Sequence, residues 1–214
     1  MHRIMVANPK GGCGKSTLAI HLASWFAQRD ERVCLVDLDR QQSSRYWLER
    51  RPASLPPICS GQIDDESVLH APADCTVAII DTPAGLHGKA LKHLLGEVNR
   101  VVVPVSPSRF DMQASLDFFE ELAATKALRK ERVSVAIVGM RVEPRTLASQ
   151  ELMRFLAQFE LPLVTCLRSS QRYVQAVESG VSVLDGRDAA GAGDRAQWQP
   201  LLDWLVRSQR PQQR

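Results

Sequence analysis

The sequence lacks several features that define whole classes of proteins. Its five cysteines are scattered and form no C-x-x-C pair, so they indicate reduced thiols and neither a disulfide framework nor an iron–sulfur site. Glycine and proline number only 12 each in 214 residues, too few for a fibrous or disordered chain. The formal net charge is only +3, from 27 basic and 24 acidic residues, which excludes a histone-like polycation.

Long apolar runs are also missing. The longest, such as 77–80 and 101–103, have the length of a strand and cannot cross a bilayer. The first apolar stretch, 4–7, leads directly into glycine-rich sequence, so we expect no signal peptide and a cytoplasmic location. The composition, 44% hydrophobic and 24% charged, predicts one folded domain over 1–214.

Short β-branched segments alternate with amphipathic helical patterns along the whole chain. We expect strands at 3–7, 33–37, 77–81, 101–105, 133–139 and 163–167. We expect helices at 15–28, 43–50, 89–96, 113–127 and 147–158. This alternation predicts an α/β fold, with a mostly parallel twisted sheet covered by helices on both faces. The proline-rich segment 51–62 and the small, polar segment 186–195 are expected to be surface loops.

The strongest local signal is the segment 8–17, NPKGGCGKST, between the first expected strand and the first expected helix. Its glycines allow the backbone to fold around phosphate oxygens, and the following helix adds the positive end of its dipole. Lys15 is expected to reach the β- and γ-phosphates, and the Ser16 hydroxyl to ligate Mg²⁺. The residues expected to bind the nucleotide are Gly11, Gly12, Cys13, Gly14, Lys15, Ser16 and Thr17. We therefore predict ATP and Mg²⁺ as cofactors, the alternative being a glycine-rich turn without a ligand.

Three aspartates follow two of the expected strands. Asp37 and Asp39 come at the end of the second strand, and Asp81 closes the hydrophobic third strand. Carboxylates at the carboxyl ends of parallel strands lie where such folds bind ligands. A hydrophobic strand closed by aspartate is the Walker B arrangement, whose carboxylate holds Mg²⁺. A single such aspartate can instead cap the next helix, but three on two strands favour a magnesium site.

The phosphate loop also contains a second lysine, Lys10, and has proline where the ordinary motif has glycine. The resulting K-G-G-x-G-K-S resembles the deviant Walker A motif of the ParA/MinD family of dimeric ATPases. The resemblance implies that Lys10 reaches across a sandwich dimer to the partner's ATP, where a cation supplied in trans stabilises the transferred phosphoryl group. It also implies that Asp37 helps to organise the Mg²⁺ shell and that Asp39 positions or activates the attacking water. Arg40 departs from the family, which usually has proline there.

Three further segments resemble the small ParF-type partition ATPases: 39–47 (DRQQSSRYW), 104–115 (PVSPSRFDMQAS) and 172–184 (RYVQAVESGVSVL). The resemblance implies an ATP-dependent homodimer, with higher polymers left open, and a small ParB/ParG-like partner or cargo adaptor. It further implies non-specific binding to nucleoid DNA and partition of plasmids or chromosomes, or positioning of another cargo, reset by slow hydrolysis. Because the phosphate loop begins near residue 10, we expect no N-terminal helix-turn-helix domain.

Non-specific DNA binding would require cations that face the phosphates. The candidates flank expected strand ends in the C-terminal half: Arg141, Arg145, Arg168 and Arg172. A second basic stretch is the tail with Arg207, Arg210 and Arg214. The alternative for each arginine is an ordinary solvated surface residue, and for Arg168 also a place near the adenine base.

The last expected helix has an apolar stripe made of Trp198, Leu201, Leu202 and Leu205. A MinD-like spatial regulator would dock on membranes through such a helix, but the opposite face lacks the Lys/Arg-rich composition of a membrane-surface helix. We therefore expect the stripe to pack in the core, and no membrane partner. A metabolic P-loop enzyme or metal-carrier ATPase is a further alternative, although the sequence has no evident paired cysteines or histidine ligand spacing.

Overall fold

The computed structural model describes residues 1–64, 69–186 and 188–207. Its main strands are β1 (His2–Val6), β2 (Val33–Asp37), β3 (Ile58–Ser60), β6 (Val77–Asp81), β7 (Arg100–Val105), β8 (Ser134–Met140) and β9 (Leu163–Leu167). These strands form one parallel sheet in the order β3-β2-β6-β1-β7-β8-β9. A separate antiparallel pair consists of β4 (Gln62–Ile63) and β5 (Leu69–His70).

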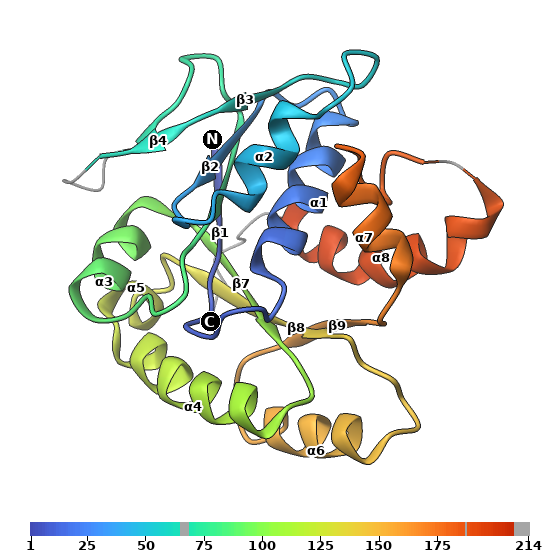
Figure 1. Cartoon of the computed structure of the whole chain (residues 1–214). Coiled ribbons are helices and arrows are strands. Elements are labelled where there is room, and N and C mark those ends of the chain that lie inside the picture. Colours follow the sequence, from blue (N-terminus) through green and yellow to red (C-terminus); the bar gives the residue numbers. More distant parts are fainter. Residues whose placement is uncertain (65–68, 187, 208–214) are drawn as a thin grey trace.

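Helices cover both faces of this sheet (Figure 1). They are α1 (Lys15–Ala27), α2 (Ser43–Glu49), α3 (Gly88–Glu97), α4 (Arg109–Ala124), α5 (Lys126–Arg129), α6 (Leu147–Leu156), α7 (Gln171–Glu178) and α8 (Ala192–Val206), with a 3₁₀ turn, η1, at Ala189–Gly191. Figure 1 shows α1, α2, α7 and α8 on one face and α3 to α6 on the other. The α/β fold expected from the alternating pattern is therefore confirmed.

Successive strand residues point to opposite faces and build two hydrophobic cores. On β1, Ile4 and Val6 pack with residues of α1 and α8, whereas Met5 packs with residues of α3, α4 and α6. Because both faces are buried, the strands read as nearly continuous apolar runs instead of alternating ones. The six expected strands are all present, with ends within a residue or so of the predicted ones.

Both segments expected to be loops contain regular structure, so those expectations were wrong. Within 51–62, β3 pairs with β2 and extends the sheet edge, with Cys34 opposite Cys59. Only Ile58 of its three residues is buried, so the sequence has no hydrophobic pattern there that would predict a strand. Within 186–195, the Asp188 side chain accepts a hydrogen bond from the Gly191 N–H, so η1 begins there and α8 follows from Ala192. This side-chain cap, which the composition does not reveal, is why the segment begins a helix where a loop was expected.

The apolar stripe of the last helix packs in the core, as expected. Trp198, Leu201, Leu202 and Leu205 of α8 are all at most 2% exposed and belong to the core that includes α1. None of the helices within the described ranges has both the length and the apolar character that a membrane span needs.

Candidate nucleotide-binding site

The carboxyl ends of β1, β2 and β6 meet in the middle of the sheet. In the parallel register Asp81 stands opposite Val6 of β1 and opposite Asp37 of β2. The chain then crosses from β6 to β7 on the far side of β1, so the strand order reverses at this point. In open parallel sheets, ligands bind at the carboxyl edge where the order reverses.

The loop that follows β1 has the backbone of a phosphate-binding loop. Gly12 and Gly14 adopt positive φ angles of 73° and 103°, which side chains strongly disfavour. Lys15 begins α1, and its Nζ donates a hydrogen bond to the Lys10 carbonyl at 2.9 Å. The Cys13 thiol is buried and donates to the same carbonyl at 3.2 Å. Both hydrogen bonds join the end of the loop to its beginning at Lys10. The loop therefore curves back on itself, and the N-terminus of α1 points into the concave side of that curve.

Asn8 fixes this loop to the neighbouring elements, a contribution that our sequence analysis missed. Its side chain is fully buried, and its Oδ1 accepts from the Lys10 N–H at 2.8 Å. Its Nδ2 donates to the Pro104 carbonyl at 2.8 Å and to Ser115 Oγ of α4 at 3.0 Å. A buried amide with these partners holds the backbone at Lys10 against β7 and α4. A polar residue between an apolar strand and a glycine-rich loop was the available signal.

The three aspartates lie together at the ends of β2 and β6. Both Asp37 oxygens accept backbone hydrogen bonds at 3.0 Å, from Asp39 and from Arg45 of α2. Asp39 in turn accepts from the Gln41 N–H at 3.0 Å. Asp37 thus shapes the segment that presents Asp39. The geometry agrees with the expected grouping of these carboxylates.

Asp81 is fully buried beside the phosphate loop. Its Oδ2 accepts a short hydrogen bond from Ser44 on α2, and its Oδ1 has no partner among the described residues. Burial raises the pKa of this carboxyl to about 6, although hydrogen bonds from the Ser44 and Ser16 hydroxyls pull it down. The sequence did not indicate Ser44, because the two residues are 37 positions apart.

These residues fit a magnesium ion. The Asp81 carboxyl, one of whose buried oxygens has no partner among the described residues, lies close to the Ser16 hydroxyl and within the field of Lys15. Mg²⁺ prefers oxygen ligands, commonly one or two carboxylates or hydroxyls together with phosphate oxygens and water. A bound ion would favour the ionised form of Asp81 and so offset the cost of its burial.

A cavity of about 1010 Å³ opens above the loop. Its lining includes most of the predicted nucleotide ligands and two of the three predicted catalytic residues, Lys15 and Asp39: Gly11, Gly12, Gly14, Lys15, Ser16, Thr17 and Asp39. Two arginines, Arg40 and Arg141, line it as well. Arg141 was predicted as a DNA contact, whereas its guanidinium donates to the Gly12 carbonyl of the phosphate loop at 2.6 Å.

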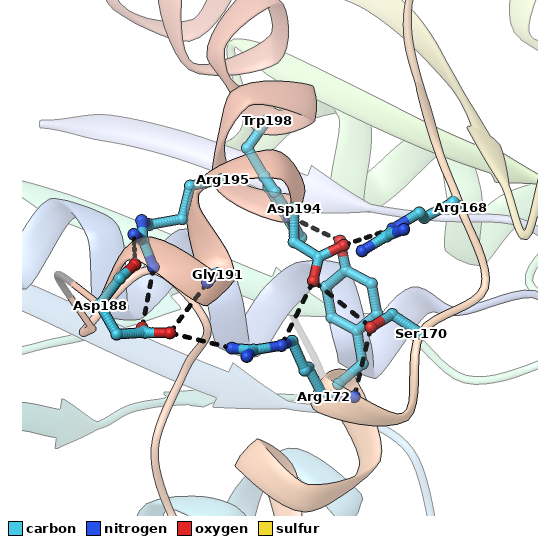
Figure 2. Close-up of polar contacts among 9 residues, drawn as sticks. Arg168, Ser170, Arg172, Asp188, Gly191, Asp194, Arg195 and Trp198 are labelled. Atoms are coloured by element: carbon cyan, nitrogen blue, oxygen red, sulfur yellow. Dashed lines mark hydrogen bonds and ion pairs between the residues drawn. The ribbon is translucent and has the colours of Figure 1, made fainter.

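Two other predicted DNA contacts are engaged in ion pairs at the junction of β9, α7 and α8. Figure 2 shows Asp194 of α8 between Arg168 and Arg172. Arg168 Nε donates to Asp194 at 2.7 Å, and Arg172 donates to Asp188 at 3.1 Å. The Asp194 side chain is fully buried, and its hydrogen bond and charge raise the pKa of Arg168. Both arginines keep nearly half of their side-chain surface exposed.

The remaining predicted cations differ in their surroundings. Arg145 is exposed in the turn between β8 and α6. Arg207 contributes its backbone carbonyl to a 2.7 Å hydrogen bond from Arg100. The tail residues Arg210 and Arg214 lie outside the described residues. Of the four arginines predicted from sequence, Arg141 is exposed and lines the nucleotide cavity, whereas Arg168 and Arg172 lie at the junction of β9, α7 and α8.

A parallel sheet whose first strand leads into a glycine-rich loop and a helix, with a buried aspartate on the adjacent strand, defines a P-loop nucleotide-binding protein. The chain belongs to the CobQ/CobB/MinD/ParA nucleotide binding domain family, which matches residues 4–183. The resemblance to ParA/MinD ATPases expected from the loop is thereby confirmed.

Known proteins of similar sequence and structure agree with this family. The protein named Maintenance of carboxysome distribution protein A from Halothiobacillus neapolitanus is 29% identical over 197 residues, covering 87% of this chain and 90% of the relative. The protein of the same name from Gloeobacter kilaueensis is 28% identical, with 97% and 95% covered. The solved structure of apo McdA from Cyanthece superposes with a TM-score of 0.72 at 16% identity, covering 97% of this chain and 100% of that one. At that identity the superposition establishes the fold alone.

Proposed function

We propose that residues 1–214 act as one ATPase domain that works as a positioning switch. ATP and Mg²⁺ bind in the cavity, two copies associate around the nucleotide, and the dimer binds DNA non-specifically. Slow hydrolysis resets the cycle and releases the dimer from the nucleoid. ATP can drive such a switch only through its different affinity for monomer and dimer.

The observation that carries the proposal is that Lys15, Ser16 and Asp39 line one cavity, with Asp37 and the buried Asp81 at the adjoining ends of β2 and β6 and Lys10 in the same phosphate loop. Lys15 binds the phosphates, Ser16 and Asp81 hold Mg²⁺ with help from Asp37, and Asp39 positions the attacking water. The Lys10 backbone is fixed by Asn8 while its side chain is only partly buried. That arrangement suits a cation supplied to a second copy.

The names of two relatives support a class of cargo. Two of them are named for the distribution of carboxysomes, which favours positioning of a large cellular cargo over synthesis of a metabolite. We propose that a small ParB/ParG-like partner or cargo adaptor links the dimer to that cargo. Plasmids, chromosomes and protein compartments are all cargo of this kind.

DNA binding is proposed for the exposed parts of Arg168, Arg172 and Arg145. Ion pairs with Asp188 and Asp194 hold the first two guanidinium groups in fixed positions, with N–H groups left for phosphates. Because this binding neutralises phosphates, its affinity should fall steeply as salt rises.

The test is ATP turnover with and without non-specific double-stranded DNA, at low and at raised salt. We expect slow turnover that DNA stimulates, with the stimulation lost at raised salt. Lys15→Ala should remove nucleotide binding. Lys10→Ala should leave much of the binding while impairing the ATP-dependent dimer and turnover, and Asp39→Ala should keep ATP and the dimer but stall hydrolysis.

Three outcomes would contradict the proposal. Turnover that ignores DNA but responds to anionic liposomes would indicate a MinD-like membrane regulator. Turnover that depends on a small carboxylic acid would indicate a biosynthetic ligase. Loss of ATP affinity in Asp39→Ala as severe as in Lys15→Ala would show that the residue assignments are wrong.

A further inference from the structure

Arg141 lies where the end of β8 packs against the phosphate loop. Its backbone is left-handed, with φ of 53°, an uncommon conformation for a residue other than glycine. Immediately before it, the buried Met140 packs so closely on the loop that a Cβ at Gly14 would be 2.7 Å from the Met140 Cε. The end of β8 and the loop are therefore fitted to each other, and the turn at Arg141 directs its side chain back over the loop.

One nitrogen of the Arg141 guanidinium bridges two elements. Nη2 donates to the Gly12 carbonyl at 2.6 Å and to Ser106 Oγ at 3.0 Å. Ser106 follows β7 and is buried, so it gives the guanidinium a fixed anchor. The arginine thus ties the tip of the phosphate loop to the scaffold between β7 and β8.

The bond to Gly12 sets the orientation of a peptide that a phosphate ligand uses. A trans peptide is planar, with its C=O and N–H pointing in opposite directions. Holding the Gly12 carbonyl toward Arg141 therefore fixes the direction of the Cys13 N–H. Backbone N–H groups held inward before the ligand arrives are what a phosphate loop needs to bind without further ordering.

We propose that Arg141 is a positioning residue of the nucleotide site, which orients the Gly12–Cys13 peptide of the phosphate loop for the phosphates of a nucleoside triphosphate. The inference rests on the proposed function in that it takes this cavity to be an ATP site. It replaces the expectation that Arg141 contacts DNA, because its guanidinium is engaged on the loop.

The experiment measures the affinity for ATP, ADP and inorganic pyrophosphate by calorimetry without DNA, for the wild type, Arg141→Ala, Ser106→Ala and the double variant. Arg141→Ala should weaken all three ligands about tenfold, the effect of losing one charge-assisted hydrogen bond. Ser106→Ala should weaken them about threefold, and the double variant should be no weaker than Arg141→Ala alone, since both act through one bridge. Arg154→Ala, at an exposed arginine of α6, is the matched control and should stay within twofold of wild type.

A second readout follows the loop itself. Hydrogen exchange of the peptide covering 11–16 should be faster in ligand-free Arg141→Ala than in the wild type, at equal thermal midpoints. DNA binding at saturating ATP should be unchanged in Arg141→Ala. The proposal is overturned if Arg141→Ala binds ATP as the wild type does, or if it loses DNA binding at saturating ATP with normal nucleotide affinity. Failure of the wild type to bind ATP would instead overturn the proposed function. In that case the wild type and Lys15→Ala, which is expected to bind no nucleotide, would give the same calorimetric result.

Discussion

Asp81 is a buried carboxyl that suits the magnesium site but lowers the free energy of unfolding of the ligand-free protein. Its folded-state pKa of about 6 lies above the ordinary value of 3.8 because burial penalises its charge. Such a group favours folding while protonated, and this contribution is lost as pH rises from about 4 through 6. We expect Asp81→Asn to raise the free energy of unfolding at pH 8 by about 2–3 kcal/mol and to abolish Mg²⁺-dependent turnover.

Urea denaturation of the ligand-free protein at pH 4.5 and pH 8 measures this effect. The gain should shrink toward the lower pH, where the wild-type carboxyl is already protonated. Asp37→Asn is the matched control, and we expect it to lose about 1 kcal/mol, because both Asp37 oxygens accept backbone N–H groups and an amide has only one acceptor. An Asp81→Asn protein less stable than wild type at pH 8 would contradict the assignment of an unpaired buried charge.

At the scale of elements, His21 connects the phosphate-loop helix to the C-terminal helices. Its ring stacks on Trp198 of α8 with centroids 5.2 Å apart and meets Tyr173 of α7 edge-on at 5.3 Å. Its Nδ1 donates to the Thr17 carbonyl at 2.8 Å, and its Nε2 is buried without a partner among the described residues. Burial lowers the pKa of His21 to about 4, so this contact requires the neutral ring.

A depressed histidine pKa makes the packing of these helices sensitive to acid. Stability from neutral His21 is complete above the ordinary pKa of 6.5 and is lost as pH falls toward 4. We expect the wild type to lose about 2 kcal/mol of its free energy of unfolding between pH 7 and pH 5 through His21. His21→Phe, which keeps a ring against Trp198, should not show this loss.

Comparing both proteins at each pH by urea denaturation cancels the opposite contribution of Asp81. His93→Phe, which replaces an exposed histidine of α3 by the same residue, is the matched control for the substitution itself. Identical acid limbs for His21→Phe and the wild type would show that His21 titrates in the folded state as it does in the unfolded chain.

Elements could be predicted where their signal is local. The apolar strands, the phosphate loop and the buried stripe of α8 are each visible within a few residues of sequence, and the structure has them as expected. The edge strand β3 was missed because it is three residues long and takes its identity from pairing with β2. Propensity alone cannot reveal an element that exists only through a partner strand.

The partners of the arginines could not be predicted for a related reason. Asp194, which binds Arg168, lies 26 positions further along the chain, on a helix that the composition predicts as a loop. Ser106 and Gly12 lie 35 and 129 positions from Arg141. Sequence alone indicates that such cations lie near strand ends, but only the fold determines whether they meet solvent, a carboxylate or the phosphate loop.

At the scale of the whole molecule, the same edge of the sheet carries both the nucleotide cavity and an exposed apolar pair. Phe110 and Leu147 are 81% and 77% exposed, in the first turns of α4 and α6 just beyond β7 and β8. An ion pair of 3.7 Å between Arg109 and Glu151 joins the two helices there. Contiguous exposed apolar patches commonly mark association surfaces, and we expect Phe110 and Leu147 to contribute to one.

We expect the double variant Phe110→Ser with Leu147→Ser to weaken ATP-dependent self-association at least tenfold while ATP affinity stays within twofold. The physical reason is that Asn8 ties α4, through Ser115 in its second turn, to the backbone of Lys10, so we expect a second copy that receives Lys10 to extend over α4. Sedimentation equilibrium with a non-hydrolysable ATP analogue measures the dimer constant.

Val206→Ser is the matched control, because Val206 is 48% exposed at the end of α8. The adjacent Arg207 carbonyl accepts a hydrogen bond from Arg100 at the start of β7, which places Val206 at the amino edge of the sheet, away from the cavity. Equal dimer constants for the double variant and the wild type would exclude the α4–α6 edge from the interface. If Val206→Ser weakened the dimer as much as the double variant, the two copies would associate through a face other than the one that carries Lys10.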